Sequence, residues 1–174
     1  MKGKIWIKSM LEAYNYIGRV VGAIDKRVLN KGVKSHFTFG YNETLGAVDA
    51  ILFLVERKRK LSAIKFLIED SLKVISQKSA KTLMLRFMDK LTDQEIANVL
   101  KVSKRTVQRM LDKALGECYL AFLRQGYSAE VLQEYLKDDK WLVGIYNNNL
   151  YKSKLRKDLQ KIPPKISFNN FLWN

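Results

Sequence analysis

The stretch from Thr92 to Leu115 predicts two short helices joined by a tight turn. Its apolar residues recur with a helical period of about 3.6 residues, but the phase of that period shifts near Lys101. A phase shift of this kind is typical of two helices that pack on each other. Thr92 can cap the first helix, with Glu95 completing a capping box, and Ser103 can cap the second.

The second of these helices, at about residues 103–115, has a basic face that is rich in hydrogen-bond donors. In a helix-turn-helix the first helix braces the second, whose N-terminal side chains enter the major groove of DNA. Donors of this kind suit base edges and phosphate oxygens. We therefore predict that the following residues bind double-stranded DNA: Thr92, Ser103, Lys104, Arg105, Thr106, Gln108, Arg109 and Lys113. The alternative is a helical hairpin whose charges are only solvated.

The turn of this motif is expected at Lys101. That position is often glycine, because the chain there tends to adopt a left-handed conformation that costs a residue with a Cβ about 1 kcal/mol. We expect the lysine to be tolerated there at this cost.

Composition limits the possible partners. The chain has 174 residues, enough for one domain or two small ones, and its formal net charge is +15. Such an excess of cations indicates an anionic partner. No apolar run approaches about 18 residues, and the first residues lack the pattern of a signal peptide. We expect a cytoplasmic protein without membrane association.

Candidate catalytic and metal-binding residues are scarce. Cys118 is the only cysteine, which fits a reducing cytosol, and no histidine lies near it in the sequence. His36 has no carboxylate or thiol at ligand spacing, and no glycine-rich phosphate loop occurs. We expect no enzymatic activity, no metal and no cofactor.

The N-terminal region predicts a helix from Ile7 to Val28, with apolar residues in steps of three and four. Its apolar face either packs within the same chain or forms a coiled coil in a homodimer. We expect the first, because stable coiled coils usually need at least about three to four heptads. Residues 30–42 predict a break, whose aromatic residues either cover the core or stack on unpaired bases.

A second helix is expected from Asn42 into a basic cluster made of Arg57, Lys58, Arg59 and Lys60. These cations either compensate the dipole at the C-terminus of that helix or contact phosphate. A third helix is expected from Ser62, and a fourth from Ala80 to Asp89 leads into the helix-turn-helix.

The C-terminal part of the sequence predicts a helix that ends at Gly126 and a short helix after it. Residues 147–149 predict a polar loop, and Pro163 ends any helix that precedes it. The aromatic residues Phe168, Phe171 and Trp173 dock either on this chain or its second copy, or on a partner. We therefore predict an all-α fold with a helical N-terminal region (1–78), a helix-turn-helix domain (79–137) and a basic and aromatic C-terminal tail (138–174).

The segment from Leu83 to Tyr119 reads LMLRFMDKLTDQEIANVLKVSKRTVQRMLDKALGECY. It resembles region 4 of the sigma-70 family of RNA polymerase sigma factors. The resemblance implies that Lys104, Arg105 and Gln108 read the promoter's −35 element. Arg105 stands where housekeeping sigma factors have an acidic residue. A guanidinium cannot accept a hydrogen bond from a base amino group, so we expect a different target sequence.

The resemblance implies a sequence-specific transcription regulator that contacts RNA polymerase. The order of a helix ending in ERKRK, a connecting helix and the motif is also similar to that of small phage late-gene activators. The expectation is thus divided between a divergent sigma factor and such an activator. The alternative class is a helical protein-interaction module that does not read DNA sequence.

Overall fold

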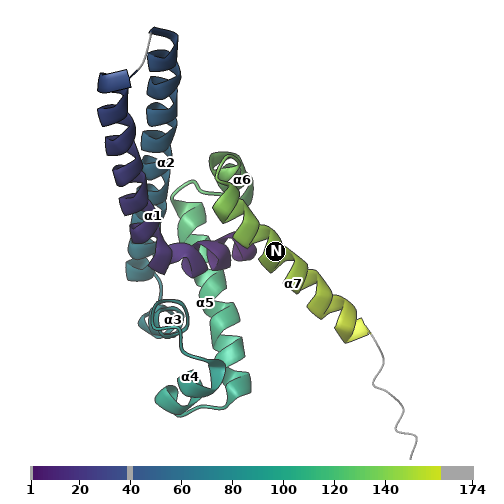
Figure 1. The fold of residues 1–174 in the computed structure, drawn as a ribbon. Coiled ribbons are helices and arrows are strands. Elements are labelled where there is room, and N and C mark those ends of the chain that lie inside the picture. The colour runs from purple at the N-terminus through teal and green to yellow at the C-terminus, as the bar shows by residue number, and fades with distance from the viewer. Residues whose placement is uncertain (1, 39–40, 162–174) are drawn as a thin grey trace, which may run out of the picture.

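The computed structural model describes residues 2–38 and 41–161, with side chains for residues 2–33 and 45–155. Figure 1 shows that the described residues form helices without strands, which confirms the predicted all-α fold. The elements are α1 (Lys2–Thr38), α2 (Tyr41–Val74), α3 (Gln77–Leu83), a π-helical turn η1 (Met84–Met88), α4 (Asp93–Leu100), α5 (Lys104–Arg124), α6 (Ala129–Leu136) and α7 (Lys140–Lys161).

The two longest helices form an antiparallel pair. In Figure 1, α1 first crosses the body of the molecule and then turns to run alongside α2. The upper ends of both helices project beyond the other elements. We call the part of this pair made of residues 20–38 of α1 and 41–57 of α2 the arm.

Most buried apolar side chains belong to one cluster. Met10 of α1, Ile64 of α2, Phe122 of α5 and Leu142 of α7 are each fully buried in it. The cluster therefore takes residues from all three segments into which the sequence was divided, 1–78, 79–137 and 138–174. The three segments thus share one core. The domain boundaries at residues 78 and 137 stay a prediction.

Two predicted breaks are absent from the long helices. The break predicted at residues 30–42 is wrong for residues 30–38, because α1 continues to Thr38. The helix start predicted at Ser62 is also wrong, because α2 runs without interruption from Tyr41 to Val74. Neither glycine nor proline occurs between residues 57 and 74, and lysine and arginine have good helix propensity. The aromatic side chains of Phe37, Phe39 and Tyr41 lie outside the described residues.

The polar loop predicted at residues 147–149 is wrong as well. These asparagines lie within α7, and Asn149 is only 4% exposed. Its Nδ2 donates hydrogen bonds to Ser9 Oγ at 3.1 Å and to Glu12 Oε2 at 2.7 Å, both on α1. Tertiary partners for the amide group thus outweigh the weak helix propensity of asparagine. The tail aromatics Phe168, Phe171 and Trp173 lie outside the described residues.

The helix predicted from Ala80 to Asp89 is divided into α3 and η1. The last turn is widened to a π-helix, and Asp89 N–H closes it on the carbonyl oxygen of Met84 at 3.0 Å. Lys90 then takes a left-handed conformation, with φ 59°. This reversal directs the chain from η1 into α4.

Candidate nucleic-acid interface

The N-terminus of α4 has the capping box that the sequence predicts. The backbone N–H of Glu95 donates to Thr92 Oγ1 at 3.3 Å, and the backbone N–H of Thr92 donates to Glu95 Oε2 at 2.7 Å. The backbone N–H and the hydroxyl of Thr92 both donate to the Glu95 carboxylate, and these two bonds hold the pKa of that carboxyl below its usual value. A carboxylate in this position stabilises the helix start through the macrodipole.

The turn between α4 and α5 is left-handed at Lys101, as expected, with φ 51° and ψ 47°. Lys101 N–H donates to the carbonyl oxygen of Asn98 at 3.3 Å, and Val102 N–H donates to that of Ala97 at 3.0 Å. These bonds close the end of α4, so that α5 begins at a fixed angle.

A small apolar cluster fixes α5 on α4. Ile96 and Ala97 of α4 and Val107 of α5 are 0%, 4% and 0% exposed. Ser103 caps α5 by accepting a hydrogen bond from Thr106 N–H at 3.1 Å. The first turns of α5 are therefore held both by packing and by a cap.

The opposite face of α5 is exposed and rich in donors. Lys104, Arg105, Gln108 and Arg109 are spaced as neighbours on one helix face, and all four are exposed. Among the described residues, Lys104, Arg105 and Arg109 have no hydrogen-bond or ion-pair partner. Gln108 Nε2 makes only a long contact of 3.4 Å with a carboxylate oxygen of Asp93.

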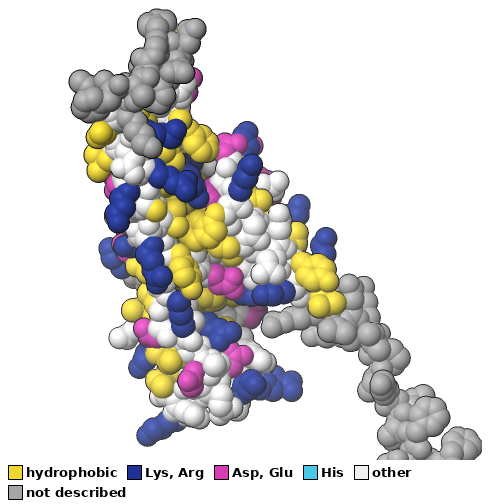
Figure 2. Space-filling view, viewed as in Figure 1, with side chains coloured by type: hydrophobic (Ala, Val, Ile, Leu, Met, Phe, Trp, Pro, Cys, Tyr) yellow, Lys and Arg dark blue, Asp and Glu magenta, His cyan; other side chains and the backbone are white. Residues whose placement is uncertain are grey.

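The remaining predicted contacts flank this face. Thr92 and Ser103 are exposed at the two helix starts, and the Oγ1 atom of Thr106 lies 2.8 Å from the hydroxyl of Ser103. Lys113 lies farther along α5, where its Nζ is 3.8 Å from a carboxylate oxygen of Glu117. Figure 2 shows Lys and Arg side chains at the lower end of the molecule, around α4 and the start of α5.

The basic cluster on α2 differs in that each member has an internal partner. Arg57 pairs with Asp139 at 2.8 Å, Lys58 with Asp25 at 2.6 Å and Arg59 with Glu56 at 3.0 Å. Lys60 Nζ lies 5.4 Å from the ring centroid of Tyr135. The predicted dipole role is wrong, because α2 continues past these residues to Val74.

Asp139 is a structurally important residue that was not predicted from the sequence. Its side chain is 7% exposed, and one carboxylate oxygen accepts the backbone N–H groups of Trp141 and Leu142 at 3.1 Å each. It therefore caps α7 while its other oxygen binds Arg57. An aspartate just before a helical stretch is an N-cap signal that could have identified it.

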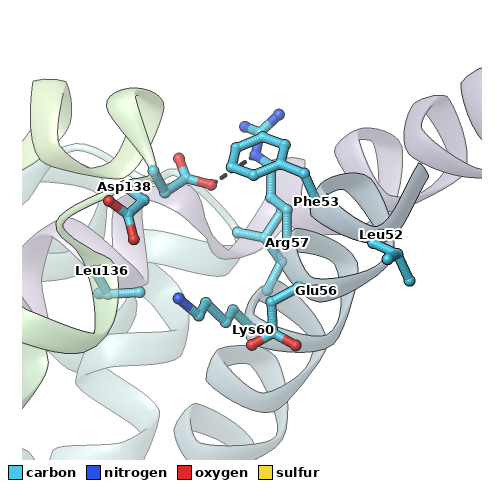
Figure 3. A pocket seen from close by; sticks show the side chains of 9 residues that line it. Leu52, Phe53, Glu56, Arg57, Lys60, Leu136 and Asp138 are labelled. Carbon is cyan, nitrogen blue, oxygen red and sulfur yellow. Dashed lines mark hydrogen bonds and ion pairs between the residues drawn. The ribbon is translucent and has the colours of Figure 1, made fainter. Parts of the chain in front are cut away.

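An apolar pocket of about 310 Å³ lies beside this ion pair. Figure 3 shows Leu52 and Phe53 of α2 on one side, with Leu136 and Asp138 of the α6–α7 junction on the other. Its charged rim is largely paired internally, so it lacks the unpaired donors of the α5 face.

Comparison with protein families identifies the group to which this arrangement belongs. The family model described as ECF sigma factor matches residues 29–118, slightly more than half of the chain. The chain belongs to the ECF sigma factor family. Its members are transcription regulators and not enzymes. Neither the comparison with curated proteins nor the comparison with solved structures gave a match.

The ECF sigma factor match includes the end of α1, all of α2 to α4 and most of α5. The donor-rich face of α5 lies within it. Residues 2–28 of α1, together with α6 and α7, lie outside it and pack on the shared core. Within the described ranges, no helix is long and apolar enough to cross a membrane, and no cluster of three or more acidic, histidine or cysteine residues could hold a metal ion.

Proposed function

We propose that this ECF sigma factor family member acts in the cytoplasm as a sequence-specific DNA-binding regulator of transcription. Its recognition helix, at about residues 103–115, enters the major groove. The observation that carries this proposal is the exposed face of α5. On it Lys104, Arg105 and Arg109 have no hydrogen-bond or ion-pair partner among the described residues. A rigid helix that presents unpaired donors suits base edges and phosphates.

The test begins with selection of the preferred duplex from a random pool, followed by substitution of the recognition helix. Arg105→Ala and Gln108→Ala should each reduce the preference for the selected site over random duplex by about 1–3 kcal/mol. Lys113→Ala should weaken binding to both duplexes alike. Arg124→Ala, at the far end of the same helix, is the matched control and should leave both affinities unchanged.

An unchanged ratio of specific to random affinity in Arg105→Ala would show that this residue does not read bases. The rival function, a helical protein-interaction module, is separated by the salt dependence of binding to random duplex. Neutralisation of phosphates produces a steep dependence on salt, whereas an interaction module shows no such binding.

We further propose that the arm contacts RNA polymerase. Apolar side chains that normally pack in a core are exposed along it, and exposed apolar patches often mark interaction sites. They are Leu29 (67%), Val33 (60%), Leu45 (52%), Val48 (45%), Leu52 (60%), Phe53 (57%) and Val55 (47%). Figure 2 shows apolar surface between cations over this part of the molecule.

Two measurements test the polymerase contact. Leu29→Ser and Leu52→Ser should weaken binding to purified core polymerase, whereas Leu120→Ser, an exposed leucine on α5, should not. Transcription in vitro then separates the two forms of the proposal. A sigma factor initiates with core polymerase alone, while an activator requires polymerase that already holds another sigma factor. Failure of both reactions would contradict the polymerase proposal.

A further inference from the structure

A pair of cations at the surface surrounds one exposed tyrosine of α1. Tyr16 is 40% exposed. Lys90 Nζ donates a hydrogen bond to its hydroxyl at 3.0 Å and lies 4.6 Å from the ring centroid. The guanidinium carbon of Arg19 lies 5.4 Å from the same centroid. One aromatic ring thus holds two cations that come from separate segments.

The carboxylate that lines the same pocket as Tyr16 and Lys90 is engaged elsewhere. Within the part of the chain that the structure describes, neither Arg19 nor Lys90 forms an ion pair with a carboxylate. Glu12, which lines the same shallow pocket, accepts a hydrogen bond from Asn149 and pairs with Lys8. The basic cluster on α2, by contrast, is largely paired with carboxylates. The positive charge beside Tyr16 is therefore available to an external anion.

This cationic pair lies next to the helix-turn-helix. Lys90 precedes Thr92, the N-cap of α4, by two residues. Asn15 Nδ2 donates to the carbonyl oxygens of Phe87 at 3.0 Å and of Met88 at 2.9 Å, which fixes η1, just before Lys90, on α1. In helix-turn-helix complexes the first helix of the motif crosses the phosphate backbone. A cation at this point is thus close to the expected path of the DNA backbone.

We propose that Lys90 and Arg19, positioned by Tyr16, bind a phosphodiester of duplex DNA beside the groove that α5 reads. This inference rests on the proposed DNA-binding function. The pocket at this place is open, with a volume of about 400 Å³, and Arg86 lines it as well. The hydrogen bond from Lys90 lowers the pKa of Tyr16, in accord with a positive local potential. The site extends the DNA footprint onto a part of α1 outside the family match.

The test is equilibrium binding of the full chain to a random-sequence duplex over a series of salt concentrations. Each phosphate contact contributes about 0.9 to the slope of log affinity against log salt concentration. Lys90→Gly and Arg19→Ala should each reduce the slope, and the double variant should reduce it by about 0.9 because one phosphate contact is lost. The ratio of specific to random affinity should stay unchanged. Lys90→Gly is suitable because glycine readily adopts the φ of 59° found there.

Lys31→Ala is the matched control. This exposed lysine lies on α1 about 18 Å beyond Arg19, toward the end of the arm. Its slope should equal that of the unmodified chain. Unchanged slopes in both Lys90→Gly and Arg19→Ala, with unchanged melting temperatures, would overturn the inference. Unchanged slopes together with weaker polymerase binding would overturn it too, and would assign the cations to polymerase.

The outcome for the unmodified chain separates this inference from the function on which it rests. If the unmodified chain binds random duplex without any salt dependence, the DNA-binding function itself fails. If it shows a steep slope that the two substitutions do not change, only the phosphate site on α1 fails.

Discussion

The indole ring of Trp6 stacks on the phenol ring of Tyr146, with centroids 4.0 Å apart and an angle of 16° between the ring planes. Trp6 is 2% exposed and Tyr146 8%, so this contact joins the start of α1 to α7 inside the core. Through this contact α7, which lies in the segment predicted as a tail, packs on the core of the fold.

Removing this stack should destabilise the whole fold. Tyr146→Ala loses buried ring area and the stacking contact, and should lower the free energy of unfolding by about 3–5 kcal/mol in urea denaturation. Tyr146→Phe keeps the ring and should cost less than about 1.5 kcal/mol. Equal losses in the two variants would show that the hydroxyl, and not the stacked ring, matters.

Lys101→Gly should stabilise the chain by up to about 1 kcal/mol. The residue has φ 51°, a conformation that is strained for any side chain with a Cβ but not for glycine. Lys101→Ala keeps the Cβ and should give no such gain in the same thermal unfolding experiment. A gain for alanine as large as that for glycine would mean that charge, not backbone strain, is responsible.

Alkaline pH should weaken the fold through one buried thiol and one partly buried phenol. Burial raises the pKa of the Cys118 thiol from 9.0 to about 12. Burial and a hydrogen bond to Glu69 raise that of Tyr14 from 10.0 to about 12. Both groups favour folding in their neutral form, so their contribution is complete below pH 9 and declines as pH rises toward 12.

This decline is measured as the free energy of unfolding in urea at a series of alkaline pH values. Cys118→Ala should make the pH dependence above pH 9 shallower than that of the unmodified chain, and Tyr14→Phe should do so above pH 10. Parallel pH curves for the unmodified chain and both variants would contradict the assignment.

The basic cluster on α2 should matter for stability and not for DNA affinity. Arg57→Ala leaves Asp139 buried without its cation, and should lower the free energy of unfolding by about 2–3 kcal/mol. Arg59→Ala, whose side chain is 73% exposed, should change it by less than about 0.5 kcal/mol. Weaker binding of Arg57→Ala to random duplex at unchanged stability would instead assign the cluster to phosphate contact.

The helix-turn-helix could be predicted from the sequence because its determinants are local. Thr92 and Glu95 are three residues apart, and the cap at Ser103 bonds to Thr106. The loss of phase near Lys101 marks the turn, and the left-handed conformation found there is the one this motif usually has. Such features depend on near neighbours in the chain, which a single sequence displays directly.

Other features depend on partners distant in the sequence. Asn149 resembles a loop residue until Ser9 and Glu12 are seen to bind its amide. The cations beside Tyr16 could not be grouped from the sequence, since Lys90 reaches the ring only after η1 docks on α1. The role of Arg57 was likewise hidden, because Asp139 lies on another element.

The bond between Ser9 and Asn149 spans 140 residues, so it also sets an order of events during synthesis. At roughly 5–20 residues per second, the ribosome adds Asn149 about 7–28 s after Ser9. Throughout that interval the newly made α1 lacks the helix that covers Trp6. The nascent chain therefore presents apolar surface for much of its translation, and folding chaperones have time to bind it before α7 emerges.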